Sequence, residues 1–184
     1  AKPPSLKRSS FNEEDVSDKP RYLRRRTASR KDMTHLHRQR LRSLAAVDEA
    51  NAAMLRRLKK LGELEDTLVV FTSDNGFLLG EHRLRGKNFP YEENLQVPLL
   101  VRGPGLDRGV RSTAPASIVD LPATFLDAAG VWETASQRRR VDGASLLPAA
   151  RGAESTGLSG TALVQAGTSL AAARKKGHGW LFRG

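Results

Sequence analysis

Residues 67–105 read TLVVFTSDNGFLLGEHRLRGKNFPYEENLQVPLLVRGPG, and this stretch decides the fold. Two apolar runs, residues 67–71 and 97–101, enclose a polar loop with several glycines. Each run is too short for a helix and lacks the alternation of a half-exposed strand, so each predicts a strand buried on both faces of a parallel sheet. We therefore expect two neighbouring strands of one sheet, with a long loop between them.

A carboxylate and an amide follow the first predicted strand directly. Asp74 and Asn75 stand where the apolar run ends, and Gly76 comes next. Ligands of open α/β sheets gather beyond the carboxyl ends of the strands, where such oxygen atoms are suited to a hard cation. Asp-Asn-Gly is also ordinary turn chemistry. The residues alone leave a cation site and a simple turn as alternatives.

Several short motifs occur in a fixed order along this stretch: SDNG at 73–76, LGEH at 79–82, GK at 86–87, YEE at 91–93 and VPLLVRGPG at 97–105. Together they resemble the second half of the type I sulfatases of the alkaline phosphatase superfamily, with a spacing most similar to the N-acetylglucosamine-6-sulfatase and glycosaminoglycan sulfatase branch. The resemblance implies an α/β fold with a mixed, mostly parallel sheet flanked by helices, incomplete at both ends. It also implies that residues 1–150 are the second half of a catalytic domain and that 151–184 are a linker and the start of a C-terminal subdomain.

The resemblance further implies a set of site residues. Asp74 and Asn75 would be two ligands of one Ca²⁺, and Lys87 would bind the sulfate of a sulfated small molecule or sulfated glycan. Lys87 and His82 are the candidate catalytic residues, and Phe77 and Glu81 are further candidate substrate contacts. Two of these residues keep alternative roles. His82 either lines the substrate pocket or ties the loop down by a hydrogen bond. Phe77 is either a wall of the pocket or part of the core.

The sequence departs from the family at the nucleophile. Type I sulfatases carry Cys-x-Pro-x-Arg or Ser-x-Pro-x-Arg, whose first residue becomes formylglycine, but this sequence has no cysteine and no such serine string. We therefore expect the formylglycine in a missing N-terminal half that would be a partner of this chain, and we expect the chain to be inactive alone. The competing hypotheses are a phosphate or phosphonate ester hydrolase of the same superfamily and a non-enzymatic basic protein that binds polyanions.

The flanking segments predict scaffold. Apolar residues at three- and four-residue steps from 31 to 61 predict an amphipathic helix with one buried stripe that ends at Gly62. Residues 11–20 predict a surface loop. A second helix is expected to end at Gly130, with Asp120 as an acid of its first turn, favoured by the helix dipole. VDGASLLP, at 141–148, resembles a surface linker of the sulfatases, and residues 162–165 and the closing GWLFRG are strand candidates.

Composition narrows the possible partners. The formal net charge is +11, but aromatic residues make up only 5% of the sequence and the basic clusters have no aromatic interleaving. This favours solvated basic faces or attraction for a polyanionic substrate over specific nucleic-acid binding. The N-terminus, AKPPSLKRSS, lacks the apolar region of a signal peptide, and no apolar run is long enough to span a bilayer. The compartment stays open, although full-length members of the family are often exported.

Overall fold

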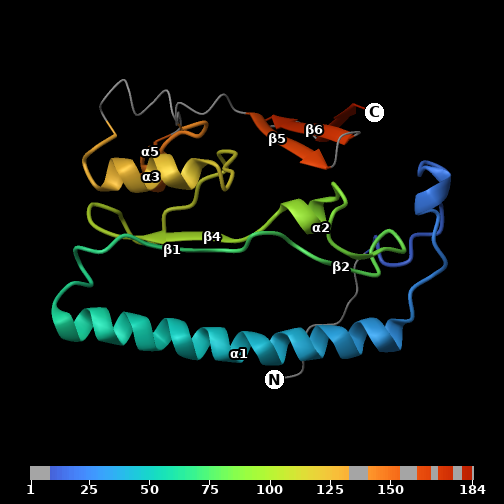
Figure 1. The fold of residues 1–184 in the computed structure, drawn as a ribbon, viewed down its shortest axis with the longest axis horizontal. Helices are drawn as coiled ribbons and strands as arrows, with labels where there is room; N and C mark the ends of the chain where they lie inside the picture. Colours follow the sequence, from blue (N-terminus) through green and yellow to red (C-terminus); the bar gives the residue numbers. More distant parts are fainter. Residues whose placement is uncertain (1–8, 133–140, 154–160, 167–169, 176–179, 184) are drawn as a thin grey trace. The chain divides into compact units, whose positions relative to one another are not determined.

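The computed structural model describes residues 9–132, 141–153, 161–166, 170–175 and 180–183 of the 184-residue chain. Its helices and short sheets confirm the mixed α/β class (Figure 1). The chain divides into two compact units, one formed by residues 1–63 with 75–97 and the other by residues 64–74 with 98–184. The domain boundary near residue 150 stays a prediction.

The first unit contains one long helix, α1 (Arg30–Leu61), as the apolar spacing predicted. At its start the hydroxyl of Ser29 accepts a hydrogen bond from the backbone N–H of Asp32 at 3.3 Å. At its end Gly62 has φ +80°, a left-handed conformation that glycine adopts without a steric penalty. The signal at Gly62 was local, and this is why the end of the helix was predictable.

The prediction that α1 buries its whole apolar stripe is wrong. Met33 is its buried residue, whereas Leu44 is 51% exposed and Met54 is 58% exposed. The buried apolar residues of this unit are few: Phe11, Met33, Leu78, Leu79 and Leu84. A helix of 32 residues is about 48 Å long, so a core of this size covers only part of it.

A small hairpin and a short helix belong to the same unit as α1. Strands β2 (Leu78–Leu79) and β3 (Arg85–Gly86) pair antiparallel, and α2 spans Glu92–Leu95. The segment before α1, which includes the 3-10 helix η1 (Arg21–Leu23), joins the hairpin through a bridge between Phe11 and Glu81. The expectation of a surface loop at 11–20 is therefore wrong for Phe11 and Lys19, which are 8% and 3% exposed.

In the second unit, β1 (Val69–Thr72) and β4 (Leu99–Arg102) are neighbours, as predicted. They pair antiparallel, with Val69 opposite Arg102, and not parallel. They are also not buried on both faces, because Leu100 is 63% exposed. Figure 1 shows the two strands side by side. Both runs lack alternating polar residues, but this pattern specifies neither the relative direction of the two strands nor how far their side chains are buried.

Helix α3 (Asp120–Ala128) ends near Gly130, as expected, and packs with the short helix α5 (Leu147–Ala150). Asp120 is its first residue, and its two carboxylate oxygens accept from the backbone N–H of Ser117 at 2.7 Å and of Ala144 at 3.0 Å. The segment 141–148 is not a surface linker, because Leu146 and Leu147 are both 4% exposed. Residues 145–147 of this segment are buried, and the backbone N–H of Leu146 donates to the Thr124 hydroxyl of α3.

Three further strands, β5 (Thr161–Ala166), β6 (Leu170–Lys175) and β7 (Trp180–Arg183), form an antiparallel sheet in that order. Both strand candidates near the end of the sequence are thus confirmed. In the part of the chain that the structure describes, no helix is long and apolar enough to cross a membrane.

Candidate active site

Asn75 and Lys87 are brought together by the loop that follows β1. The amide nitrogen of Asn75 donates to the carbonyl oxygen of Gly76 at 2.8 Å. Its amide oxygen accepts a hydrogen bond from the Lys87 ammonium at 3.2 Å. Both residues belong to the first unit, and Lys87 is exposed. This hydrogen bond links a predicted metal ligand to the predicted sulfate-binding group.

Asp74 lies two residues beyond the end of β1 and is exposed. Its carboxylate is within 3.5 Å of the Ser73 hydroxyl. Asp74 ends the segment that belongs to the second unit, and Asn75 begins the segment that belongs to the first. Asp74 and Asn75 are joined by one peptide bond, and both present oxygen atoms.

Gly76 allows the loop to pass close to α2. Its backbone N–H donates to the carbonyl oxygen of Asn94 at 2.8 Å. A Cβ atom at this position would lie 1.9 Å from the carbonyl oxygen of Glu93. Because that neighbour is backbone, only glycine fits without movement of α2. The glycine therefore sets the path of the chain between Asn75 and the hairpin.

His82 is held between two carboxylates from distant parts of the sequence. Its Nδ1 lies 3.0 Å from Glu13 Oε2, and its Nε2 lies 3.3 Å from Glu93 Oε2. The ring stacks on Tyr91 with centroids 3.9 Å apart and an interplanar angle of 15°. With both nitrogens engaged, the imidazole has the contacts of a loop tie, the second of the two alternatives. We call His82, Glu13, Glu93 and Tyr91 the imidazole clamp.

A buried lysine supports the clamp. Lys19 forms ion pairs with Glu13 and with Asp18. Burial opposes its charge, but the hydrogen bonds to Glu13 and Asp18 outweigh burial and raise the pKa of Lys19. Burial also raises the pKa of Tyr91, against the attraction of the nearby Lys19 charge. Lys19 thus stays charged beside Glu13, which also contacts the histidine.

Glu93 is stabilised as a carboxylate. Burial disfavours its charge, but hydrogen bonds from its own backbone N–H and from the Ser10 hydroxyl, together with the contact to His82, lower the pKa of Glu93. The Ser10 hydroxyl donates at 2.8 Å. The sequence analysis missed Ser10, Glu13 and Glu93, and it had no signal that joins positions about 70 to 80 residues apart.

Glu81 and Phe77 have partners within the same unit. Glu81 is 3% exposed, and its carboxylate accepts a hydrogen bond from the backbone N–H of Leu79. Phe77 is half-buried under the Arg40 guanidinium, which lies 4.3 Å from the ring centroid. The observed contacts of both side chains are with residues of the hairpin and of α1. Their roles as substrate contacts therefore stay predictions.

We expect Glu93→Gln to change how stability depends on pH. Because the folded pKa of Glu93 lies below its ordinary value of 4.5, its carboxylate stabilises the fold above that pH, and this contribution is lost as the pH falls through the folded pKa. Urea unfolding of the purified chain should show the variant less stable near pH ~7, with the difference shrinking toward pH ~3. Glu14→Gln, at an exposed site, is the control. An equal deficit at both pH values would contradict the expectation.

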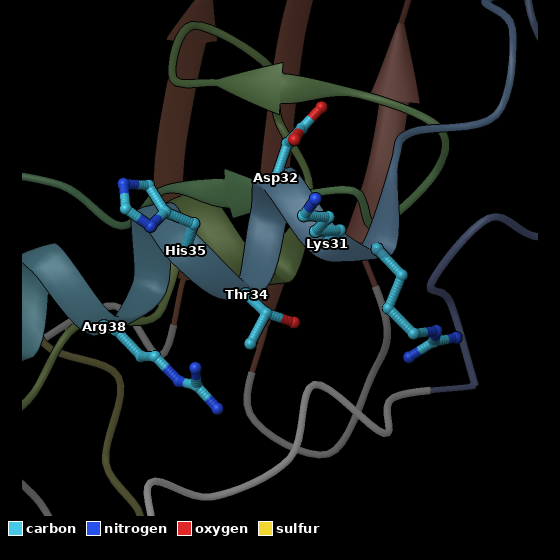
Figure 2. Close-up of a pocket in the computed structure, with 6 residues that line it drawn as sticks. Lys31, Asp32, Thr34, His35 and Arg38 are labelled. Atoms are coloured by element: carbon cyan, nitrogen blue, oxygen red, sulfur yellow. The ribbon is translucent and has the colours of Figure 1, made fainter.

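A surface hollow lies at the start of α1, lined by Arg30, Lys31, Asp32, Thr34, His35 and Arg38. Figure 2 shows the side chains of Lys31, Asp32, Thr34, His35 and Arg38 extending from the first turns of the helix. None of the predicted site residues lines it. Within the described ranges, no three histidine, aspartate or glutamate side chains form a cluster suited to a metal ion.

Two curated relatives are similar to this chain over its larger part. The extracellular sulfatase SULF-1 homolog of Drosophila melanogaster is 43% identical over 110 residues, which are 59% of this chain and 10% of that protein. The N-acetylglucosamine-6-O-sulfatase of Bacteroides thetaiotaomicron is 46% identical over 109 residues, 59% of this chain and 19% of that protein. The chain therefore spans well under a quarter of the length of these relatives.

Solved structures extend the comparison to the fold. The structure of the protein BT4656 in complex with its substrate, D-glucosamine-2-N,6-O-disulfate, has 34% sequence identity to this chain. Its TM-score is 0.60 over 72% of this chain and 28% of that chain. The phosphonate monoester hydrolase of Silicibacter pomeroyi has 25% identity and a TM-score of 0.62 over 74% of this chain and 30% of that chain. The sulfatase family model matches residues 6–131. The chain belongs to the sulfatase family, which lies within the alkaline phosphatase superfamily.

Proposed function

We propose that this chain supplies part of the site of a Ca²⁺-dependent sulfuric ester hydrolase. In this proposal Asp74 and Asn75 are two metal ligands, and Lys87 binds the sulfate group. The observation that carries the proposal is the 3.2 Å hydrogen bond from Lys87 to the Asn75 amide oxygen. It supports the proposal because a cation site and a sulfate site must adjoin if both act on one ester. Membership of the sulfatase family is the second support.

The donor chemistry of the two ligands fits the proposed metal. Ca²⁺ prefers oxygen donors, about six to eight of them, and Asp74 and Asn75 offer a carboxylate and an amide oxygen. The Asn75 amide has its nitrogen engaged by Gly76, which leaves its oxygen as the atom on the Lys87 side. Bound Ca²⁺ would supply positive charge against the sulfate oxygens. The remaining donors would come from other residues or water.

Lys87 would act on the ester through its charge and its position. The lysine side chain is a compact cation on a flexible stem. Its hydrogen bond to Asn75 restricts that stem, so the ammonium would be partly ordered before the substrate arrives. Ordering in advance lowers the cost of binding and of stabilising charge that develops on the sulfate. Its substrate would be a sulfated small molecule or a sulfated glycan.

His82 would hold the loop that carries Lys87. The hydrogen-bonded clamp of Glu13 and Glu93 restrains the imidazole five residues before the lysine. We keep His82 as a candidate residue of the site, acting through loop position. Phe77, just before β2, and Glu81, next to His82, would help to hold the same hairpin.

The nucleophile of the proposed enzyme would come from a segment outside this sequence. With no cysteine and no Ser-x-Pro-x-Arg string, the sequence has no site for formylglycine. The purified chain should therefore not hydrolyse an aryl sulfate, with or without Ca²⁺, because binding groups alone provide no covalent path. Addition of a separately made segment that carries the nucleophile is the positive control. Metal-dependent turnover by the chain alone, above a blank, would overturn this assignment.

The second candidate is a phosphonate or phosphate ester hydrolase, favoured by the likeness to a phosphonate monoester hydrolase. The completed enzyme should be assayed with an aryl sulfate and an aryl phosphonate monoester at equal concentration. A higher kcat/KM for the sulfate supports the first proposal, and a higher value for the phosphonate supports the second. A non-enzymatic polyanion-binding role, suggested by the net charge of +11, would show salt-dependent binding and no turnover.

A further inference from the structure

The outer face of α1 carries a line of basic residues: Lys31, Arg38, Arg42, Arg56 and Lys60, which we call the basic ridge. At about 100° per residue, all five project within about 40° of one direction around the helix. The ridge runs from Lys31 to Lys60, a span of 30 residues and about 44 Å. On this line the helix has one acidic residue, Glu49. The ridge is thus a long surface of nearly one sign of charge.

The ridge side chains are exposed, and none has a hydrogen bond or ion pair with another residue in the described part of the chain. Other basic residues of α1 behave differently. Arg40 lies over the Phe77 ring at 4.3 Å, and Arg30 lies over the Phe11 ring at 4.1 Å. Arg40 and Arg30 therefore serve packing within the unit, whereas the ridge faces outward.

The stability of α1 does not explain the ridge. Arg38 with Arg42, and Arg56 with Lys60, are like-charged pairs at i and i+4, which cost a helix about 0.2–0.5 kcal/mol each. Of the ridge residues at the helix ends, Lys31 stands in the first turn, where the helix dipole favours acidic residues, and Lys60 stands in the last turn, where it favours basic ones. A solvated helix face gains by mixing signs at these positions. The ridge therefore costs local stability, as expected of residues that serve binding.

The hollow of Figure 2 lies at one end of the ridge, where Lys31 and Arg38 both line it. The Thr34 hydroxyl and the His35 imidazole add hydrogen-bond donors to the same hollow. The lining also contains one carboxylate, Asp32, but its three basic residues outnumber it, so the hollow suits an oxyanion. A single sulfated sugar would contact only one end of the ridge, whereas an extended polyanion would contact its whole length.

We propose that the basic ridge of α1 binds a sulfated polysaccharide along its length. The proposal rests on the proposed sulfatase function and deepens it, because it names a polymeric substrate class that the ridge would retain near the enzyme. A nucleic acid is the less suited polyanion. Helix α1 contains no phenylalanine, tyrosine or tryptophan, the side chains on which unpaired bases stack best.

The test measures binding of a heparin dodecasaccharide to the full 184-residue chain by fluorescence anisotropy at several NaCl concentrations. The ridge variant is Lys31→Gln/Arg38→Gln/Arg42→Gln. Its matched control, Arg108→Gln/Arg111→Gln/Arg151→Gln, removes the same charge from exposed positions in the second unit. We expect the ridge variant to bind on the order of tenfold more weakly, with a shallower salt dependence, and the control to change little. Circular dichroism should confirm helix content, since glutamine is a good helix former.

Three outcomes would overturn the proposal. The first is equal weakening by the two triple variants, which would mean that net charge alone decides. The second is undiminished binding of fully desulfated heparin, since sulfate would then not be recognised. The third is tighter binding of an oligo-dT of similar charge. The assay needs no turnover, so a chain without sulfatase activity still tests the ridge, and an active enzyme that ignores heparin overturns the ridge alone.

Discussion

Replacing Asp74 with alanine is expected to lower aryl sulfate hydrolysis by at least about 10³-fold in an enzyme completed with the nucleophile-bearing segment. Asp74 would contribute a full negative charge to the cation, and its loss leaves the metal under-neutralised as well as short of a ligand. Steady-state kcat/KM and the Ca²⁺ concentration for half-maximal rate would measure both effects. Asp74 is exposed, so the substitution should not disturb the core of its unit.

Asn75→Ala is the matched comparison. It removes a neutral oxygen and should cost less than Asp74→Ala, and added Ca²⁺ should restore part of the lost rate because the defect lies in metal affinity. It also removes the acceptor of the Lys87 hydrogen bond, so restoration should be incomplete. If Asp74→Ala retained full activity without added Ca²⁺, Asp74 would be a turn residue only, the alternative that the dipeptide alone left open.

The long helix shows what local sequence information determines. The apolar spacing from 31 to 61 and the glycine after it gave α1 and its end to within one residue. Capping and periodicity are properties of neighbouring positions, so they are visible in a single sequence. The burial of the helix by other parts of the chain cannot be read from neighbouring positions in this way. Leu44 and Met54 follow the apolar pattern as well as Met33 does, yet both are exposed.

The strand pair illustrates a second limit. Residues 69–72 and 99–102 form neighbouring strands, as predicted, but in antiparallel order. A short apolar run indicates that a strand forms and leaves its direction undetermined, because direction depends on the chain path between the strands. In this chain the two strands belong to the second unit, whereas most of the segment that connects them, residues 75–97, belongs to the first unit.

In the candidate site, sequence analysis found residues within one loop but missed their distant partners. Asn75 and Lys87 were predicted from motifs twelve residues apart and are hydrogen-bonded. Glu13 was assigned to a surface loop, yet it contacts His82 at 69 residues' separation. Lys19 and the acids around it look like an ordinary charged loop in the sequence, because the burial of Lys19 is set by tertiary contacts.

Lys87→Ala should lower kcat/KM for an aryl sulfate on the order of 10² to 10³, the size typical of losing one preorganised electrostatic contact to a developing charge. Added Ca²⁺ should not restore the rate, because the lysine would act on the sulfate and not through metal affinity. Lys87 is exposed, so loss of stability should not contribute to the effect. A thermal unfolding scan of the variant would check this directly.

Two further variants decide how Lys87 acts. Lys87→Met keeps the length and apolar stem but removes the charge, so it should be as impaired as Lys87→Ala if charge is what matters. His82→Ala should have the smaller effect, because the imidazole clamp would act on the rate only through the position of the loop. If Lys87→Ala kept full activity while His82→Ala abolished it, the histidine would be the sulfate-binding group. The two carboxylates beside its nitrogens would then have to release it when substrate binds.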